Sequence, residues 1–311
     1  MASLLTSICD VPGIRVGHAQ NDAAMTGCTV ILPETGAVAG VDVRGSAPGT
    51  REIEAIKLVR LVARIHAVLF SGGSAFGLDA AGGVQQYLEE KGIGFDVGVA
   101  HVPVVPSAVI FDLHVGDASV RPDKKMGLQA AKAASRETKC TGRIGVGCGA
   151  TVGKILGMQQ CMKGGVGSAC RQVGECRVGA LVVVNAFGDI VDDGTDHIVA
   201  GARHPQSGKF LDTGEYIQEL RKIDPPVALS NTTLAVVATD AGFKKEEITK
   251  IAQMAQDGLA RVIRPAHTPF DGDLVIGLSV GDKQENCLAV GMAAAGVVAD
   301  AILSAVKAAN P

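Results

Sequence analysis

PPVALSNTTLAVVATDAGF, residues 225–243, joins a core strand to a cluster of small polar side chains. From Leu234 onward, LAVVAT is a run of apolar and β-branched residues, which is typical of a buried strand. The four residues directly before it, SNTT at 230–233, carry three hydroxyls and a carboxamide. Polar groups at the point where a strand enters a core require an explanation.

Two interpretations of this segment are open. In the structural one, Asn231 and Thr232 bond to nearby backbone at a polar strand entry. In the catalytic one, the Thr232 hydroxyl is a nucleophile whose base is its own α-amine, freed when the preceding peptide bond is cut. An α-amine has a pKa of about 7.7–8.0, against about 10.4 for lysine, which suits a general base near neutral pH. The strand would hold the new N-terminus rigidly, and the hydroxyl could attack the Asn231 carbonyl in an N-to-O acyl shift. From this segment alone, the structural interpretation is favoured.

The composition indicates a globular chain with a large aliphatic core. Of 311 residues, 47% are hydrophobic and only 3% aromatic, so Ala, Val, Ile and Leu must fill the core. No linker, low-complexity block or charge run divides the chain, and we expect a single domain over residues 1–311. The net charge is −3, and no basic stripe is present, which argues against nucleic acid as the main partner.

The chain ends and the cysteines favour a cytoplasmic protein that does not contact a membrane. MASLLTSICD has neither a basic start nor a long apolar core, so we read no signal peptide. The stretch LAVGMAAAGVVA, residues 288–299, is shorter than the roughly 20 residues that a bilayer requires, and it predicts a core helix. The eight cysteines form no C-x-x-C pair, which predicts reduced packing residues.

The expected strands and helices come in runs rather than in strict alternation. This order favours layered sheets covered by helices. In the helix expected at 244–263, one apolar face contains Ile248, Ile251, Met254 or Ala255, Leu259 and Val262. We expect further helices over residues 50–61, 74–92, 123–135 and 285–309, and strands at GIRVGHA, GCTVIL, AVAGVDVR, HAVLFSGG, VPSAVIFDL and LVIGLSV.

Several motif-like segments lack the spacing that their chemistry requires. In GVGCGATVGKI, Cys148 stands where a phosphate-binding loop has its first glycine, and Ile155 stands where that loop has Ser or Thr. The same segment fails the dinucleotide G-x-G-x-x-G pattern. In SGGSAFG, Phe76 replaces the last glycine of a G-x-S-x-G elbow. The histidines show no metal-ligand spacing, and DDGTD lacks the later glutamate of a calcium loop.

Seven blocks, in order along the chain, change the balance between the two interpretations. They are VPGIRVGHAQND, GVDVRGSAPGTRE, SGGSAFGLDAAGGV, KGGVGSA, VVVNAFGD, SNTTLAVVATDA and HTPFDGD. From about residue 10 to the C-terminus, this set resembles the DmpA-type family of self-cleaving aminopeptidases and amidases. It is most similar to the branch with a threonine nucleophile, which includes the nylon-oligomer hydrolases.

The resemblance implies an α/β (α+β) fold, the four-layer αββα sandwich of the DmpA and ornithine acetyltransferase type. It also implies cleavage between Asn231 and Thr232, which would give an α chain of residues 1–231 and a β chain of residues 232–311. Thr232 would then attack a small peptide or an amino-acid amide or ester, and water would release the acyl-enzyme. No metal or cofactor is implied. Because related enzymes assemble as multimers of αβ units, we expect a homo-oligomer.

The resemblance adds four residues to the candidate site. Asn185 falls where the family has a carboxamide that stabilises the oxyanion, although a strand-end Asn capping a turn is the alternative. Asp271 and Asp273 match acidic positions beside the nucleophile and could hold the α-ammonium or position the hydroxyl, against a hydrated hairpin turn as the alternative. Strand alternation would put both on one face. Lys154 matches a lysine that reaches the site, and its alternative is a solvated surface lysine.

One departure from the family pattern leaves other functions open. Phe111 stands where better-known members have a tyrosine, and phenylalanine cannot donate a hydrogen bond. The chain could instead be an unprocessed scaffold, or it could pass an acyl group to an amino acid as ornithine acetyltransferases do. His18, Arg44, Arg51 and His267 lie in family-like blocks, but we assign them no chemistry.

Overall fold

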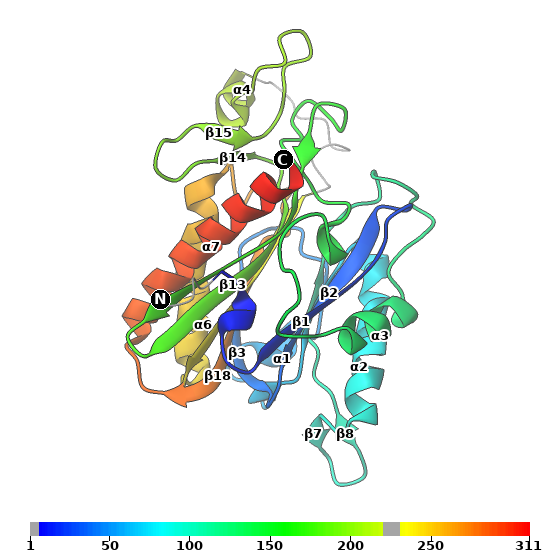
Figure 1. Ribbon diagram of the computed structural model, residues 1–311, viewed down its shortest axis with the longest axis vertical. Helices are drawn as coiled ribbons and strands as arrows, with labels where there is room; N and C mark the ends of the chain where they lie inside the picture. Colours follow the sequence, from blue (N-terminus) through cyan, green and yellow to red (C-terminus); the bar gives the residue numbers. More distant parts are fainter. Residues whose placement is uncertain (1–5, 220–230) are drawn as a thin grey trace.

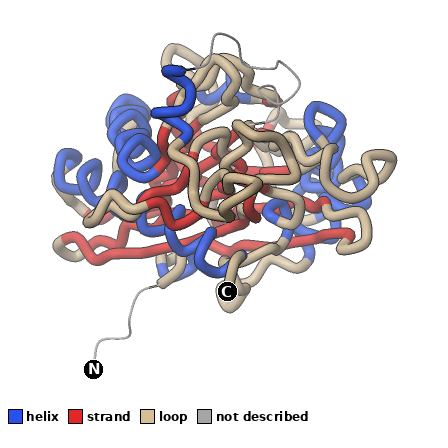
Figure 2. The backbone as a smooth tube through the Cα atoms, turned by 90° about the horizontal axis from the view of Figure 1, so that it is seen from above, coloured by secondary structure: helices blue, strands red, loops and turns tan. Residues whose placement is uncertain are grey.

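A computed structural model describes residues 6–219 and 231–311. Their strands form two main sheets stacked face to face (Figure 1). Seen from above, helices lie on both outer sides and the strands lie between them (Figure 2). The layers are therefore helices, sheet, sheet and helices, which confirms the αββα sandwich that the resemblance implies.

The first main sheet has the strand order β1-β2-β6-β9-β4. β1 and β2 form an antiparallel hairpin, whereas β6 and β9 run parallel. Helices α2 and α3 cover its outer face through an apolar cluster that includes Val30, Leu69 and Val84. The bounds are β1 Ile14–Asn21, β2 Thr26–Pro33, β4 Thr50–Arg51, β6 Val68–Ser71, β9 Ser107–Val109, α2 Ala80–Glu90 and α3 Lys124–Lys132.

The second main sheet has the strand order β12-β13-β16-β18-β3-β5 and is covered on its outer face by α6 and α7. The strand at its centre, β16, runs antiparallel to β13 and parallel to β18. The bounds are β3 Ala37–Val43, β5 Arg64–Ile65, β12 Gly165–Val173, β13 Cys176–Asn185, β16 Thr232–Ala241, β18 Leu274–Lys283, α6 Lys245–Val262 and α7 Cys287–Ala309.

The apolar run from Leu234 exists because β16 is buried on both faces. Leu234 and Val236 point into the core between the sheets, whereas Ala235 and Val237 belong to the core under α6 and α7. Successive side chains of a strand point to opposite faces, so a strand between two cores must be apolar at every position. Ser230, part of the polar cluster before this strand, lies outside the described residues.

Helix α7 is long and apolar enough to cross a membrane by length and composition, and it is the one such helix in the described part of the chain. It packs along β12 and β13, with Val290, Ala294 and Val298 buried. A Cβ at Gly167 of β12 would lie 1.9 Å from the Ala301 carbonyl oxygen, so this close approach requires glycine. The packing agrees with the predicted core helix.

Two sequence-based details were wrong, and one open alternative is resolved. The helix predicted over residues 50–61 is only α1, Ile53–Ile56, and Val59 and Leu61 beyond it are 95% and 88% exposed. The helix predicted from residue 74 begins with a 3₁₀ segment, η2 (Ser74–Asp79), before α2. On α6 the buried residue is Ala255, whereas Met254 is half-buried.

The remaining elements are short and lie at the ends of the sandwich. A three-stranded sheet in the order β15-β14-β17 lies near the C-terminal end of α7, and a hairpin of β7 and β8 projects at the opposite end (Figure 1). The bounds are β7 Phe95–Asp96, β8 His101–Val102, β10 Thr151–Val152, β11 Met162–Lys163, β14 Asp189–Val191, β15 Ile198–Ala200, β17 Ile263–Arg264, α4 Thr213–Glu219, η1 Ile8–Asp10 and η3 Gly145–Gly147.

Candidate active site

The predicted site residues meet at one edge of the second sheet. Thr232 is the first residue of β16, and it is paired with Asn185, the last residue of β13. Asn231 forms a parallel bridge to Asp271, in the register of the β16–β18 pairing and three residues before its first pair, Leu234 and Leu274. The predicted cleavage site therefore lies inside the sheet, with both of its residues buried.

The Asn231–Thr232 peptide bond has its potential nucleophile directly against it. The Thr232 hydroxyl donates a hydrogen bond to the Asn231 carbonyl oxygen. The backbone N–H of Gly272 donates to the same oxygen at 3.1 Å. A Cβ on Gly272 would lie 2.7 Å from Thr232 Oγ1, so only glycine leaves room for the hydroxyl in this place. The sequence analysis assigned Gly272 no role. The one feature that could have indicated a role is its position between Asp271 and Asp273.

Lys154 is not the solvated surface lysine of the alternative interpretation. Its side chain is buried, and its Nζ lies 3.0 Å from the backbone oxygen of Asn185 and 2.9 Å from Oδ1 of the same residue. Burial lowers the pKa of the Lys154 ammonium to about 7, while Cys161, Asp271 and Asp273 act in the opposite direction. Lys154 can therefore change its charge near neutral pH.

The carboxamide of Asn185 is oriented by its neighbours. Its Oδ1 accepts from Lys154 and, at 3.0 Å, from the backbone N–H of Thr151. Its NH₂ group donates to the Phe111 carbonyl oxygen at 3.3 Å. Because two donors occupy the oxygen end, the NH₂ end points toward Phe111, and this end is the one that oxyanion stabilisation requires.

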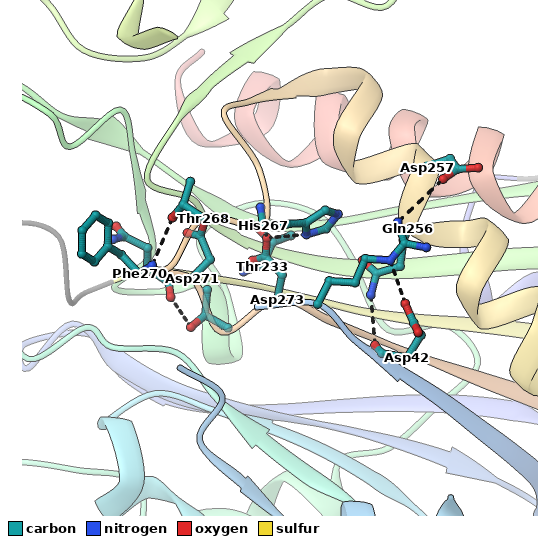
Figure 3. Close-up of polar contacts among 12 residues, drawn as sticks. Asp42, Thr233, Gln256, Asp257, His267, Thr268, Phe270, Asp271 and Asp273 are labelled. Carbon is teal, nitrogen blue, oxygen red and sulfur yellow. Dashed lines mark hydrogen bonds and ion pairs between the residues drawn. The ribbon is translucent and has the colours of Figure 1, made fainter. Parts of the chain in front are cut away.

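The two aspartates precede β18, which begins at Leu274, so they lie outside the regular strand whose alternation was expected to put both on one face. Each carboxylate holds a different part of the backbone. Asp271 Oδ2 accepts from the N–H of Thr268 at 2.7 Å, and Asp273 Oδ1 accepts from the N–H of Thr233 at 2.7 Å (Figure 3). Neither is the hydrated turn of the alternative interpretation, since both are buried.

Burial, and next the negative charge of Asp273, raise the pKa of Asp271 to about 6. Hydrogen bonds from Thr268 and the positive charge of Lys154 act against this rise. Two carboxyl groups in one buried site disfavour simultaneous ionisation, which agrees with the raised pKa of Asp271.

A small cavity opens beside Thr232. It has a volume of about 130 Å³, and its walls include Thr232, Asn231, Phe111 and Ser74. The other lining residues are small or apolar: Ala47, Pro48, Gly49, Ala75 and Val109. Larger grooves of about 440 and 520 Å³ lie elsewhere and contain none of the predicted site residues, so we place the site at the smaller cavity. Phe111 lies where the family pattern predicts, but it presents a ring without a hydroxyl.

His267 was also missed. Its ring and its backbone N–H both contact Asp273 (Figure 3). Both His267 and Asp273 lie in the HTPFDGD block, six residues apart. That spacing alone does not predict a contact, because the contact depends on how the loop between them folds. Across residues 6–219 and 231–311, no three His, Cys, Asp or Glu side chains gather as a metal site would require.

Known proteins share both this sequence and this architecture. A sequence model of peptidase family S58 matches residues 6–311. An uncharacterised aminopeptidase of Mycobacterium tuberculosis is 41% identical over 338 residues, covering 99% of this chain and 95% of its own length. A 6-aminohexanoate-oligomer endohydrolase of Paenarthrobacter ureafaciens is 32% identical over 314 residues, covering 96% and 85%.

The structural comparison defines the fold. An L-aminopeptidase D-Ala-esterase/amidase from Ochrobactrum anthropi, described as a variant of the Ntn hydrolase fold, superposes with a TM-score of 0.73 at 19% identity. The match covers 99% of this chain and 89% of the other. The chain is thus a hydrolase with the Ntn type of fold. It belongs to peptidase family S58, the DmpA family of aminopeptidases and amidases, which confirms the resemblance.

Proposed function

We propose that this hydrolase processes itself between Asn231 and Thr232 and then cleaves amide bonds with Thr232 as its N-terminal nucleophile. One observation carries the proposal: the Thr232 hydroxyl lies against the carbonyl of the preceding bond, at the first residue of a strand that is held on both sides. A merely structural polar strand entry would not require Gly272 to keep a side chain away from that hydroxyl.

The first reaction is the N-to-O acyl shift. Thr232 Oγ1 attacks the Asn231 carbonyl carbon, and the Gly272 N–H stabilises the negative charge that develops on the carbonyl oxygen. The C–N bond breaks, the proton of the hydroxyl ends on the released nitrogen, and Asn231 becomes an ester of Thr232. Water hydrolyses this ester. The products are an α chain that ends in the Asn231 carboxylate and a β chain that begins with the Thr232 amine.

Turnover repeats the same chemistry on a substrate. The Thr232 α-amine takes the proton of its own hydroxyl, and the oxygen attacks the substrate carbonyl. The NH₂ group of Asn185, oriented by Lys154, is the donor for the oxyanion. The leaving amine takes the proton, and water then releases the acyl group. The buried Asp271 and Asp273 supply negative charge for the α-ammonium of the resting enzyme.

The substrate class follows from the cavity and from the names of the relatives. The walls beside Thr232 are small and carry no ionisable side chain, which suits a slender acyl group. The relatives are named for peptides and for amide-linked 6-aminohexanoate oligomers. We therefore propose small peptides and amino-acid amides or esters as substrates, with a homo-oligomer of αβ units as the active assembly.

Mass spectrometry of purified protein under denaturing conditions tests the first reaction. Wild type should give two fragments that end and begin at Asn231 and Thr232, whereas Thr232→Ala should remain one chain of 31.7 kDa. A panel of aminoacyl and acyl p-nitroanilides tests the second reaction, with the same variant as the blank. Amide hydrolysis by full-length, uncut protein would refute the proposal. Incubation with acetyl-ornithine and glutamate checks for acyl transfer to an amino acid.

A further inference from the structure

His267 contacts one carboxylate oxygen of the site twice. Its backbone N–H and its ring Nδ1 each lie 3.1 Å from Asp273 Oδ2. The other oxygen, Oδ1, accepts from the N–H of Thr233 at 2.7 Å. Figure 3 shows the imidazole ring beside Asp273, with Thr233 on the other side of the carboxylate. Asp273 therefore connects His267 to Thr233, the residue after the proposed nucleophile, through hydrogen bonds.

The state of the ring follows from these contacts. A carboxylate accepts hydrogen bonds, so Nδ1 must carry a hydrogen. Nε2 is buried and has no hydrogen-bond partner within the part of the chain that the structure describes. His267 also adopts a left-handed backbone with φ of 55°, which is uncommon for residues other than Gly, Asn and Asp. An unfavourable backbone and a half-buried ring are thus maintained together with the contact to Asp273, which points to a role at the site.

The two carboxylates are held by unequal sets of donors. Asp273 accepts from three N–H groups: the ring and backbone of His267 and the backbone of Thr233. Asp271 is held by Thr268. Hydrogen bonds to the charged form favour that form. Asp273 is therefore held by more N–H donors than Asp271, and the ring of His267 supplies one of them.

The other charges that face the pair come from the loop that follows β10. The buried Lys154 interacts electrostatically with both Asp271 and Asp273, and Cys161 interacts with Lys154. A change in the charge of Asp273 therefore alters the electrostatic environment of Lys154, which orients the carboxamide of Asn185. The same change alters the hydrogen bond from the Thr233 N–H to Asp273, directly after the proposed nucleophile Thr232.

We propose that His267 is a positioning residue for the reaction: its ring holds Asp273 in place as an anion at the start of β16, and this keeps Thr232 aligned for self-cleavage and for turnover. The inference rests on the proposed function, since it takes Thr232 as the nucleophile. His267 itself acts through Asp273 and does not touch the reacting bond.

Two substitutions separate the ring's hydrogen bond from its other effects. His267→Asn retains an N–H donor near the position of Nδ1, and asparagine tolerates the left-handed backbone. His267→Gly removes the donor while relaxing the backbone further, so a loss in this variant does not come from strain. For both variants and wild type, the measurements are the self-cleavage rate by mass spectrometry, the kcat on a p-nitroanilide across pH, and the Tm.

We expect His267→Asn to stay within about 3-fold of wild type, and His267→Gly to lose about 10- to 100-fold in both rates, the range for a hydrogen bond to a charged group. Equal rates for the two variants, whether both fast or both slow, would overturn the proposal. Hydrolysis that survives in Thr232→Ala would instead refute the proposed function, independently of His267.

Discussion

The contact between Gly272 and the Thr232 hydroxyl makes self-cleavage sensitive to a single methyl group. In Gly272→Ala, the new Cβ would lie 2.7 Å from Thr232 Oγ1 and 2.9 Å from the Ala47 carbonyl oxygen. Ordinary contacts of a Cβ begin near 3.4 Å, so the hydroxyl must move by about 3.4 − 2.7 = 0.7 Å. A misplacement of about 1 Å can cost about 10²-fold in rate, so we expect self-cleavage to slow by about 10- to 100-fold.

The assay follows the loss of full-length precursor with time by mass spectrometry, together with the Tm. Overpacking typically costs about 1–3 kcal/mol, so the variant should still fold. Gly82→Ala, in the first turn of α2, is the matched control, because its Cβ would meet only the Lys124 side chain, at 3.9 Å. Adding Thr232→Ser to Gly272→Ala should restore part of the rate, since serine lacks the methyl group that limits where the hydroxyl can move.

Cleavage of Gly272→Ala at the wild-type rate, in a protein whose Tm is unchanged, would show that the hydroxyl does not occupy this place when it reacts. The argument for Gly272 as the group that keeps the hydroxyl against the Asn231 carbonyl would then fail. A loss of rate in Gly82→Ala of the same size would likewise remove the specific role of the contact.

Three further predictions concern the residues around Thr232. Asn185→Asp keeps an acceptor for Lys154 but removes the NH₂ donor, so kcat should fall about 10²–10³-fold while the Tm changes little; an unchanged kcat would exclude this donor. Because the pKa of Asp271 is raised to about 6, its anion is lost as pH falls through 6, so kcat should fall there, and Asp271→Asn should flatten this limb of the pH profile. Phe111→Tyr places a hydroxyl in the cavity beside Thr232 and should raise kcat several-fold on p-nitroanilides, whereas no change would show that a donor at this wall is dispensable.

The features that the sequence predicts best are those set by burial along a strand. β16 was predictable because both of its faces meet an apolar core, so its side chains are apolar without interruption. The helix predicted over residues 50–61 does not continue after Ile56 for the converse reason. Its apolar residues there have no surface to pack against, and Val59 is 95% exposed. A periodic pattern predicts an element only when a partner surface exists, and the sequence does not state where that surface is.

The contacts of the site were less predictable, because they depend on loops that close over long sequence separations. The resemblance brought Lys154 into the candidate set, but its burial against Asn185 depends on the turn between β10 and β11. His267 and Gly272 act through a hydrogen-bond donor and through a missing side chain, respectively, and neither is visible in a motif. Such roles appear only when the neighbouring atoms are known.

The strand directions explain why these residues meet at one edge. β13 runs toward this edge and ends in Asn185, β16 runs away from it and begins with Thr232, and β18 runs parallel to β16. β3 is antiparallel to β18 and delivers the backbone N–H groups of Arg44 and Gly45 to the Asp273 carbonyl oxygen, each at 3.0 Å. The strand directions thus bring the ends of β13 and β3 and the starts of β16 and β18 to one edge.

The same arrangement lets the chain be cut without losing its nucleophile. β16 is paired with β13 from Thr232 to Thr239 and with β18 from Leu234 onward, so cleavage before Thr232 removes neither ladder. What is released is the bridge between Asn231 and Asp271 and the hydrogen bond from Gly272 to the Asn231 carbonyl. The N–H of Gly272 then faces the space that Asn231 has left, while the new amine stays fixed at the end of a fully paired strand. In the proposed reaction, self-cleavage at this bond would therefore create the catalytic base and open the acyl-binding space in a single event.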